Sequence, residues 1–431
     1  MLKKFRNKEN RQLATNFANF GVFQVFNYLV PLITIPYIVR IIGAEKFGII
    51  SIALAISYYF RIIVEYGFSI TGVQLVAQAG NNLRKKSEIY SSILCIQTGF
   101  VLIGFIVLLL LVYLIEDLRS DWRVYLFTYG IVPANMLMAL WFYIGLEKIQ
   151  YLNYINFFGR LIYILTVFIL IRQIDDYYLI PILNSGAYFF SGFLSVFIIV
   201  KQFNIRLIKP GFVNLKRYLI EGWPLFISNF GINLYRNTNV IILGLVANKE
   251  IVGLYSAGEK IIKAVQSVFA PITQTLFPYI SRLRVVEPDK SIRSVKMIIK
   301  FMAIFSGTIT AIIMLFSGRI TVVALGPQFI DSTIVIRIGA LVIFFGVLNY
   351  IIGIIFMTNF GLKKEFSKSV IITGIVNLFI CYGLSKKFGL VGTALSFAGA
   401  EALLFLFMLI YIYRSKRKLF SKIGNPMARI L

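Results

Sequence analysis

The chain has 431 residues, of which 58% are hydrophobic and only 14% charged, and it carries a formal net charge of +26. A soluble globular domain has roughly 25% charged residues, so this composition indicates an integral membrane protein. The sequence contains no histidine, which excludes histidine bases, ligands and proton relays. Its two cysteines, Cys95 and Cys381, lie in apolar runs without a metal-binding motif.

Apolar runs follow one another along the whole chain, separated by short loops. A transmembrane helix needs about 20 mostly apolar residues, and only helices or closed barrels satisfy the backbone in lipid. The first run is too long for a signal peptide, so we expect it to be retained. The sequence therefore predicts an all-α, polytopic membrane bundle of about twelve transmembrane helices, with approximate limits 14–39, 47–70, 89–115, 122–146, 153–172, 178–200, 218–245, 252–280, 297–317, 329–357, 366–384 and 389–413.

The basic residues indicate the orientation of these spans. If both termini lie on one side, that side carries 29 of the 44 Lys and Arg residues. Loops rich in Lys and Arg stay in the cytoplasm, so both termini are predicted to be cytoplasmic. Most of the positive charge then marks topology and contact with anionic membrane lipid, and we expect no nucleic-acid partner.

The two halves of the chain repeat weakly. Asn19-Phe20-Gly21 returns as Asn229-Phe230-Gly231, and Phe47-Gly48-Ile49-Ile50-Ser51 returns as Val252-Gly253-Leu254-Tyr255-Ser256. The shared order predicts two pseudo-symmetric six-helix lobes, residues 1–209 and 210–431, around a central cavity. Repeat transporters place their substrate sites near the membrane midplane between such lobes.

Nine ionisable residues lie well inside the predicted spans. A charge at the bilayer centre costs about 2.5–3.5 kcal/mol even on an insertion scale, so such residues usually mark a substrate path. Arg160 and Arg337 are nearer span ends and could reach the interface instead. Cations outnumber acids, which suggests an anionic cargo: Arg61, Arg160, Arg236, Lys260, Lys263 and Arg337 stand against Glu65, Glu259 and Glu401.

Polar residues recur at helical spacing in the first two spans of each half, so each set shares one helix face. We predict that these faces bind substrate and that the three acids are candidates for cation coupling. Two alternatives stay open: asparagines can hold helices together, and Arg61–Glu65 and Glu259–Lys263 could be neutralising i,i+4 pairs. The predicted substrate-binding residues are Arg236, Lys260, Lys263, Arg61, Asn229, Asn233, Asn237, Asn27 and Gln24.

Aromatic residues make up 16% of the chain. Most are expected at the membrane interfaces and in packing. Four that lie in or beside the polar stretches could instead stack on sugar faces: Tyr58, Trp141, Tyr143 and Tyr235.

Enzyme chemistry finds little support, and we assign no catalytic residue, no metal site and no cofactor. Membrane acyl transfer usually relies on histidine, which the chain lacks. The acidic pairs Glu116-Asp117 and Asp175-Asp176 lie in very short loops. No P-loop is present, so the chain does not drive itself with ATP.

Several stretches resemble the polysaccharide and O-antigen flippase family (Wzx-type) of the multidrug/oligosaccharidyl-lipid/polysaccharide exporter superfamily. They are Arg40-Ile41-Ile42-Gly43-Ala44-Glu45-Lys46-Phe47-Gly48, Glu65-Tyr66-Gly67-Phe68, Trp141-Phe142-Tyr143-Ile144-Gly145-Leu146-Glu147-Lys148, and Trp223-Pro224-Leu225-Phe226 with Ile242-Leu243-Gly244 and Gly253-Leu254-Tyr255-Ser256-Ala257. In this order they are fairly specific, and the resemblance covers essentially the whole chain.

The resemblance implies an alternating-access flippase in the bacterial cytoplasmic (inner) membrane. Its cargo would be an undecaprenyl-diphosphate-linked oligosaccharide for O-antigen, as in lipopolysaccharide, or another surface polysaccharide. A gradient of H+ or Na+ would drive it, and its partners would be membrane lipid and other polysaccharide-assembly membrane proteins. Three alternatives remain: a multidrug or small-molecule exporter of the same fold, which the excess of cations disfavours, a membrane polymerase or ligase acting on the same glycolipid, and a bare scaffold within a biosynthetic complex.

Overall fold

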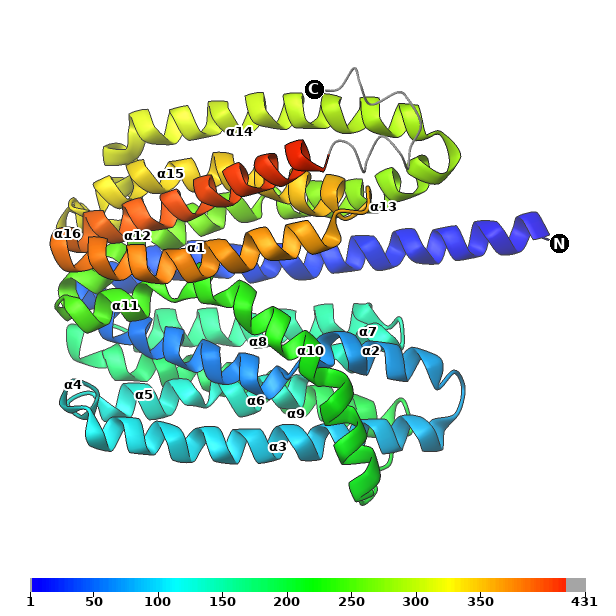
Figure 1. Ribbon diagram of the computed structural model, residues 1–431. Coiled ribbons are helices and arrows are strands. Elements are labelled where there is room, and N and C mark those ends of the chain that lie inside the picture. The colour runs from blue at the N-terminus through cyan, green and yellow to red at the C-terminus, as the bar shows by residue number, and fades with distance from the viewer. Residues whose placement is uncertain (1, 416–431) are drawn as a thin grey trace. The chain divides into compact units, whose positions relative to one another are not determined.

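The computed structural model describes the backbone of residues 2–415 and their side chains, except the side chains of 2–29, 228, 232, 234–236 and 270–275. Every regular element within residues 2–415 is a helix, which confirms the all-α fold (Figure 1). The chain divides into two compact units, Met1–Phe230 and Gly231–Leu431, here called unit 1 and unit 2. The lobe boundary predicted between residues 209 and 210 lies just before α10 (Phe212–Asn237), the helix that passes from one unit into the other.

Unit 1 contains the helices up to most of α10. Within it α1 packs on α8, α6 on α9, and α8 on α9. Its core joins aromatic side chains of several helices, among them Phe68, Tyr90, Trp141 and Phe142. In chain order the elements are α1 (Leu2–Glu65), α2 (Phe68–Gln78), α3 (Leu83–Leu114), α4 (Glu116–Arg119), α5 (Trp122–Tyr129), α6 (Ile131–Met138), α7 (Leu140–Gly145), α8 (Ile149–Leu170), the 3-10 helix η1 (Ile174–Tyr178), α9 (Leu179–Lys201) and α10.

Unit 2 is a second helical bundle. Here α14 packs on α15, α15 on α16, and α12 on α15, while α11 lies against α16. The π-helix η3 continues directly from α15. In chain order the elements are α11 (Asn239–Val246), α12 (Lys249–Ser267), α13 (Ala270–Val286), α14 (Pro288–Leu325), the 3-10 helix η2 (Pro327–Phe329), α15 (Ser332–Asn349), η3 (Tyr350–Met357) and α16 (Lys363–Arg414).

Eight helical stretches in the described part of the chain are long and apolar enough to cross a membrane. Nine of the twelve predicted spans lie wholly or almost wholly within them, and the first, 14–39, lies within them only from residue 30 onward, which supports a multi-pass membrane protein. The other two predicted spans fall on α10 to α13, which are helical but not among those eight stretches. One reason is composition, because α12 carries Glu259, Lys260 and Lys263 within 19 residues. The count of twelve spans stays a prediction.

Glycines bend the two longest helices. α1 is interrupted at Gly43 (φ 73°) and α16 at Gly389 (φ 52°), backbone conformations that favour glycine. The 52 residues of α16 would form a straight helix of about 78 Å at 1.5 Å per residue, far longer than a hydrocarbon core of about 30 Å. Figure 1 shows the chain reversing direction within each of these helices, so each contributes two antiparallel segments.

The segments that carry the family resemblance form close packing contacts in unit 1. Gly67 (φ 79°) separates α1 from α2, and a Cβ there would lie 2.9 Å from Cβ of Leu225 on α10. A Cβ on Gly72 would lie 2.7 Å from the Trp141 ring, and one on Gly145 would lie 2.7 Å from Cβ of Val76. These glycines therefore let α2 cross α7 and α10 closely.

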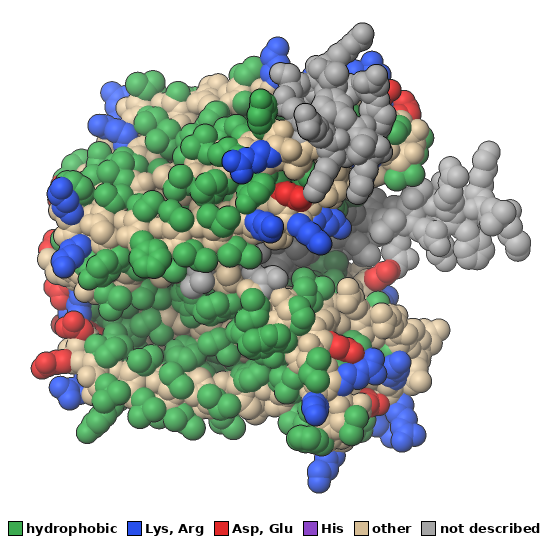
Figure 2. All heavy atoms as spheres, viewed as in Figure 1, with side chains coloured by type: hydrophobic (Ala, Val, Ile, Leu, Met, Phe, Trp, Pro, Cys, Tyr) green, Lys and Arg blue, Asp and Glu red, His purple; other side chains and the backbone are tan. Residues whose placement is uncertain are grey.

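Large apolar side chains cover the outer helices of both units. On α3 they include Leu102, Ile106 and Leu110, and on α14 Phe301 and Leu315, all exposed. Figure 2 shows such side chains along the helices, with many of the charged ones toward helix ends. An exposed apolar surface of this extent is expected where lipid, not water, is the solvent.

Candidate functional site

The most connected polar site in the described residues of unit 2 starts from α12. This helix begins at an Asn248 N-cap, whose side chain accepts a hydrogen bond from the backbone N–H of Ile251 at 2.9 Å. Gly258 packs against Val335 of α15, and Ser332 donates to the Leu254 carbonyl at 2.7 Å. Because one face of α12 is held against α15, the face that carries Tyr255, Glu259 and Lys263 at four-residue spacing is fixed in direction.

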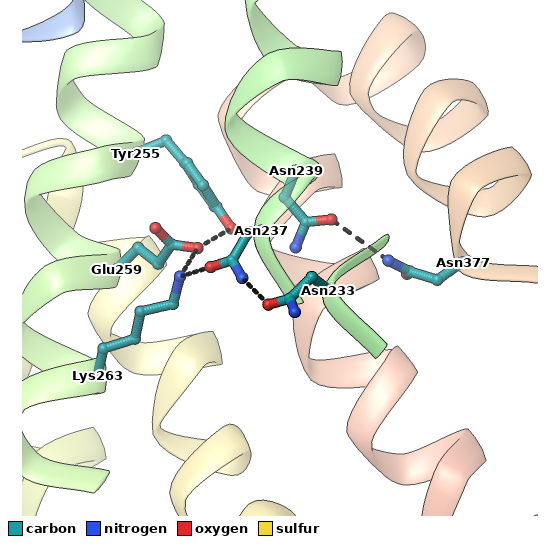
Figure 3. A network of polar contacts seen from close by, with 7 residues as sticks. All are labelled: Asn233, Asn237, Asn239, Tyr255, Glu259, Lys263 and Asn377. Carbon is teal, nitrogen blue, oxygen red and sulfur yellow. Dashed lines mark hydrogen bonds and ion pairs between the residues drawn. The ribbon is translucent and has the colours of Figure 1, made fainter. Parts of the chain in front are cut away.

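Glu259 is the centre of this face and is only 4% exposed. Its Oε1 accepts from the Lys263 ammonium at 3.1 Å and from the Tyr255 hydroxyl at 3.3 Å (Figure 3). The predicted i,i+4 pair is therefore formed. A buried carboxylate is tolerable only when it is paired and hydrogen-bonded, and both conditions hold here.

Lys263 extends the network to α10. Its Nζ donates to Oδ1 of Asn237 at 3.4 Å, and Asn237 Nδ2 donates to Oδ1 of Asn233 at 3.0 Å (Figure 3). The Lys263 ammonium also lies 5.8 Å from the centre of the Phe397 ring. Lys260 follows Glu259 directly and is within electrostatic range of Glu259 and Lys263. Carboxylate, ammonium and amide groups thus gather on one side of α12.

A second chain of polar contacts lies beside the first. Asn377 of α16 donates to Oδ1 of Asn239 at 3.3 Å (Figure 3). Ser396 donates to Oδ1 of Asn377 at 2.7 Å. All three residues are buried. Our sequence reasoning missed them, although Asn377 was detectable as a lone amide within an apolar run, a pattern that marks polar pairing inside membranes.

Glu401 has its own hydrogen-bond partner in unit 2. Its Oε2 accepts from Asn349 Nδ2 at 2.6 Å, and its backbone carbonyl accepts from the same nitrogen at 2.8 Å. Asn349 is the last residue of α15, where the π-helix begins. The pair therefore joins α16 to the junction between α15 and η3. Asn349 is a second polar partner that the sequence pattern did not indicate.

Four of the predicted residues, Arg61, Glu65, Arg160 and Asn229, belong to unit 1. Arg61 pairs with Glu65 at 3.6 Å and lies 4.7 Å from the Tyr58 ring centre. Arg160 donates to the Tyr188 hydroxyl at 2.6 Å, so it has a partner on α9. Asn229 is a half-buried residue of α10. In unit 2, Arg337 likewise donates to Ser317 at 3.1 Å.

Three predicted side chains, Arg236, Asn27 and Gln24, lie outside the described residues, as does that of Tyr235. Two aromatic residues considered for sugar stacking, Trp141 and Tyr143, are buried. The Tyr143 hydroxyl donates to the Ser195 carbonyl at 3.0 Å. The Tyr143 ring therefore packs in the core of unit 1, whereas Trp141, although buried, also lines a cavity together with Arg61 and Glu65. Among the described side chains, no group of three or more acidic or thiol ligands is placed to hold a metal ion.

Comparison with known proteins places the chain in a family. Over 413 residues it is 29% identical to a protein of Escherichia coli (strain K12) named "Putative O-antigen transporter", covering 95% of this chain and 99% of that one. It is 26% identical over 385 residues to the protein of the same name in Shigella dysenteriae, covering 89% and 96%. Both relatives are named as transporters, not as enzymes.

Solved structures share the fold at low sequence identity. The lipid II flippase MurJ in an inward closed conformation gives a TM-score of 0.70 at 14% identity, covering 94% of this chain and 89% of that one. An inward-facing multidrug resistance transporter of the MATE family gives 0.69 at 12% identity, covering 92% and 96%. The family model described as polysaccharide biosynthesis protein matches residues 13–284, well over half of the sequence. The chain therefore belongs to the polysaccharide biosynthesis protein family, in agreement with its resemblance to Wzx-type flippases.

Proposed function

We propose that this protein is a flippase that moves an undecaprenyl-diphosphate-linked oligosaccharide across the bacterial cytoplasmic membrane by alternating access. The product would serve O-antigen or another surface polysaccharide. The family membership and the two O-antigen transporter relatives support a lipid-linked glycan as the cargo class. Both termini would be cytoplasmic, so that the glycolipid enters from the side where Lys and Arg are most abundant.

The observation that carries the proposal is the polar face of α12 and its amide partners on α10. The lipid tail of such a cargo can stay in the bilayer, while its diphosphate and sugars need charge and hydrogen bonds on the way across. Ammonium and guanidinium groups bind phosphate oxygens strongly, and amides such as Asn233 and Asn237 suit sugar hydroxyls. We therefore assign diphosphate contact to Lys260 and Lys263 and sugar contact to the asparagines, and Arg236 and Arg61 remain candidates for diphosphate contact from the sequence alone.

The test is flipping in proteoliposomes. The substrate is the lipid-linked oligosaccharide purified from cells that lack this protein, and the variant is Arg236→Ala/Lys260→Ala. The control is Arg119→Ala/Lys290→Ala, which removes two cations from exposed helix ends. We expect transport by wild type and control and its loss in the variant. Equal transport by both variants would contradict the assignment of these two cations.

The same assay separates the flippase from its alternatives. Efflux of cationic dyes without movement of the glycolipid would favour a multidrug exporter. Longer glycan formed from lipid-linked repeats alone would favour a polymerase. Neither outcome agrees with the proposal, because a flippase changes the position of its substrate and leaves its covalent structure intact.

We assign cation coupling first to Glu259, because it is the buried carboxylate of the α12 face and a proton or sodium ion would compete with Lys263 for it. Glu259→Gln should abolish the dependence of flipping on the pH or sodium gradient. Glu65 and Glu401 are the remaining candidates, and the same substitution in each provides the comparison. An unchanged gradient dependence in Glu259→Gln would exclude that residue as the coupling site.

A further inference from the structure

A polar cavity of about 300 Å³ lies in unit 1, where the residues between α4 and α5 and the first turn of α5 meet the 3-10 helix η1. The cavity lies between two connections, one from predicted span three to span four and one from span five to span six. Both connections are on the outer side of the membrane in the proposed orientation. The cavity volume is at the lower end of the range of about 300–1,000 Å³ for small-molecule sites, which suits roughly one or two sugar rings. Its lining includes Ser120, Asp121, Trp122, Arg123, Tyr177 and Tyr178.

One hydrogen bond between the two connections, supported by a local bond to Asp121, gives this cavity a fixed wall. The Tyr177 hydroxyl donates to Asp121 Oδ1 at 3.0 Å, and Ser120 Oγ donates to Asp121 Oδ2 at 3.1 Å. On the Tyr177 side, Asp176 caps η1 by accepting from the backbone N–H groups of Arg172 and Gln173 at 2.8 and 3.0 Å. The binding wall is therefore ordered without a ligand, which lowers the entropy lost when one binds.

The cavity offers two kinds of recognition at once. Trp122 is 45% exposed. Tyr177 and Tyr178 stand nearly perpendicular at 6.3 Å between ring centres, and the Lys46 ammonium lies 4.9 Å from the Tyr177 ring centre. Beside these rings, the Asp121 carboxylate supplies hydrogen-bond acceptors to the lining. Arg123 supplies donors, with its guanidinium 5.6 Å from the Trp122 ring centre.

Aromatic faces next to a carboxylate and a guanidinium match the chemistry of a sugar. A pyranose ring has an apolar C–H face, which packs on an aromatic ring, and an edge of hydroxyl groups, which need both acceptors and donors. A lipid tail would not use the charged groups, and a bare anion would not use the exposed rings and would meet the Asp121 carboxylate. The lining therefore selects a neutral polyhydroxylated ligand over either of these.

We propose that this cavity is a carbohydrate-binding site for one or two sugar units of the transported glycan, separate from the α12 face. This inference rests on the proposed function, which supplies the source of the sugar and the side of the membrane on which the cavity lies. On that side the site holds the glycan after the crossing, within the same chain that moved it. The diphosphate and the lipid tail take no part in it.

The test measures binding of the released glycan, without lipid or diphosphate, to the protein in nanodiscs. The probe is the repeat-unit oligosaccharide freed by mild acid from the glycolipid used for flipping, and the readout is saturation-transfer NMR. Trp122→Ala should raise the dissociation constant of the glycan roughly tenfold through loss of the aromatic face. Asp121→Asn, which keeps the size of the side chain, should raise the dissociation constant by a smaller factor. Tyr113→Ala removes an exposed aromatic ring of α3 outside the cavity and should leave the dissociation constant unchanged.

The inference is overturned if wild type does not bind the released glycan, or if Trp122→Ala binds it as wild type does. If a phospholipid headgroup occupied the cavity instead, Trp122 would be only an interface anchor, and Trp122→Ala would bind the glycan as wild type does. Flipping of the intact glycolipid is measured on the same preparations. Flipping without glycan binding removes this inference alone, whereas glycan binding that Trp122→Ala weakens, without flipping, removes the proposed function alone.

Discussion

Replacing Lys263 with methionine removes the cation that faces the buried Glu259 carboxylate. Loss of one partner from a fully buried pair costs about 3–5 kcal/mol. The Lys263 side chain is 36% exposed, whereas that of Glu259 is 5% exposed, so water reaches the vacated position and screening lowers the cost. We expect Lys263→Met to destabilise the protein by about 2–3 kcal/mol.

The opposite substitution should cost less. Glu259→Gln leaves a half-exposed ammonium that keeps the Asn237 oxygen as an acceptor, and it should destabilise by about 1 kcal/mol. The double variant Glu259→Gln/Lys263→Met buries no unpaired charge. Its loss of unfolding free energy should therefore be about 1–2 kcal/mol smaller than the sum of the losses in the two single variants. The order of the two single costs follows directly from the unequal burial of the two partners.

Equilibrium unfolding in mixed micelles with increasing dodecyl sulfate measures these costs. Cys381 is buried in unit 2 and reports unfolding through a thiol-reactive dye, once the exposed Cys95 is replaced by serine. Equal costs for the two single variants, or an additive double variant, would refute the idea that a buried, charge-balanced pair stabilises α12.

Two further predictions use the same titration. A Cβ on Gly258 would lie 2.9 Å from a valine of α15, so Gly258→Ala should destabilise by about 1–2 kcal/mol despite its better helix propensity. A Cβ on Gly383 would have no atom within 4 Å, so Gly383→Ala should instead stabilise α16 by about 0.5–1 kcal/mol. If both alanine variants changed the unfolding free energy in the same direction, the packing argument would be contradicted. Asn349→Leu leaves the Glu401 carboxylate without its donor at 2.6 Å and should destabilise by about 2–3 kcal/mol. Adding Glu401→Gln should recover part of that loss, and no recovery would mean that the shape of Asn349, not its hydrogen bond, is what matters.

Hydropathy alone predicted where the helices lie, because lipid forces every spanning backbone into a helix whatever its tertiary partners. The run predicted at 153–172 is α8, Ile149–Leu170, and the run at 178–200 is α9, Leu179–Lys201. Internal breaks were harder to predict. The fourth predicted span is three helices, with Ala139 at φ 43° between α6 and α7, because an alanine in that conformation carries no sequence signal.

The local part of the site was predictable and the tertiary part was not. Glu259 and Lys263 meet because they are one turn apart on a single helix. Asn377 and Asn239 are 138 positions apart, and their meeting depends on how α11 and α16 rotate about their own axes. A single sequence fixes the polar face of a helix, but it does not fix which neighbour that face meets.

The polarity of α12 also has a consequence for how the chain enters the membrane during synthesis. Glu259, Lys260 and Lys263 would each cost about 2.5–3.5 kcal/mol near the centre of an isolated inserting helix, so α12 cannot partition into lipid by itself. The helices against which it packs, α15 and α16, are translated later. We expect α12 to wait at the insertion channel until those segments emerge, so that truncating the nascent chain before α15 would leave α12 outside the bilayer.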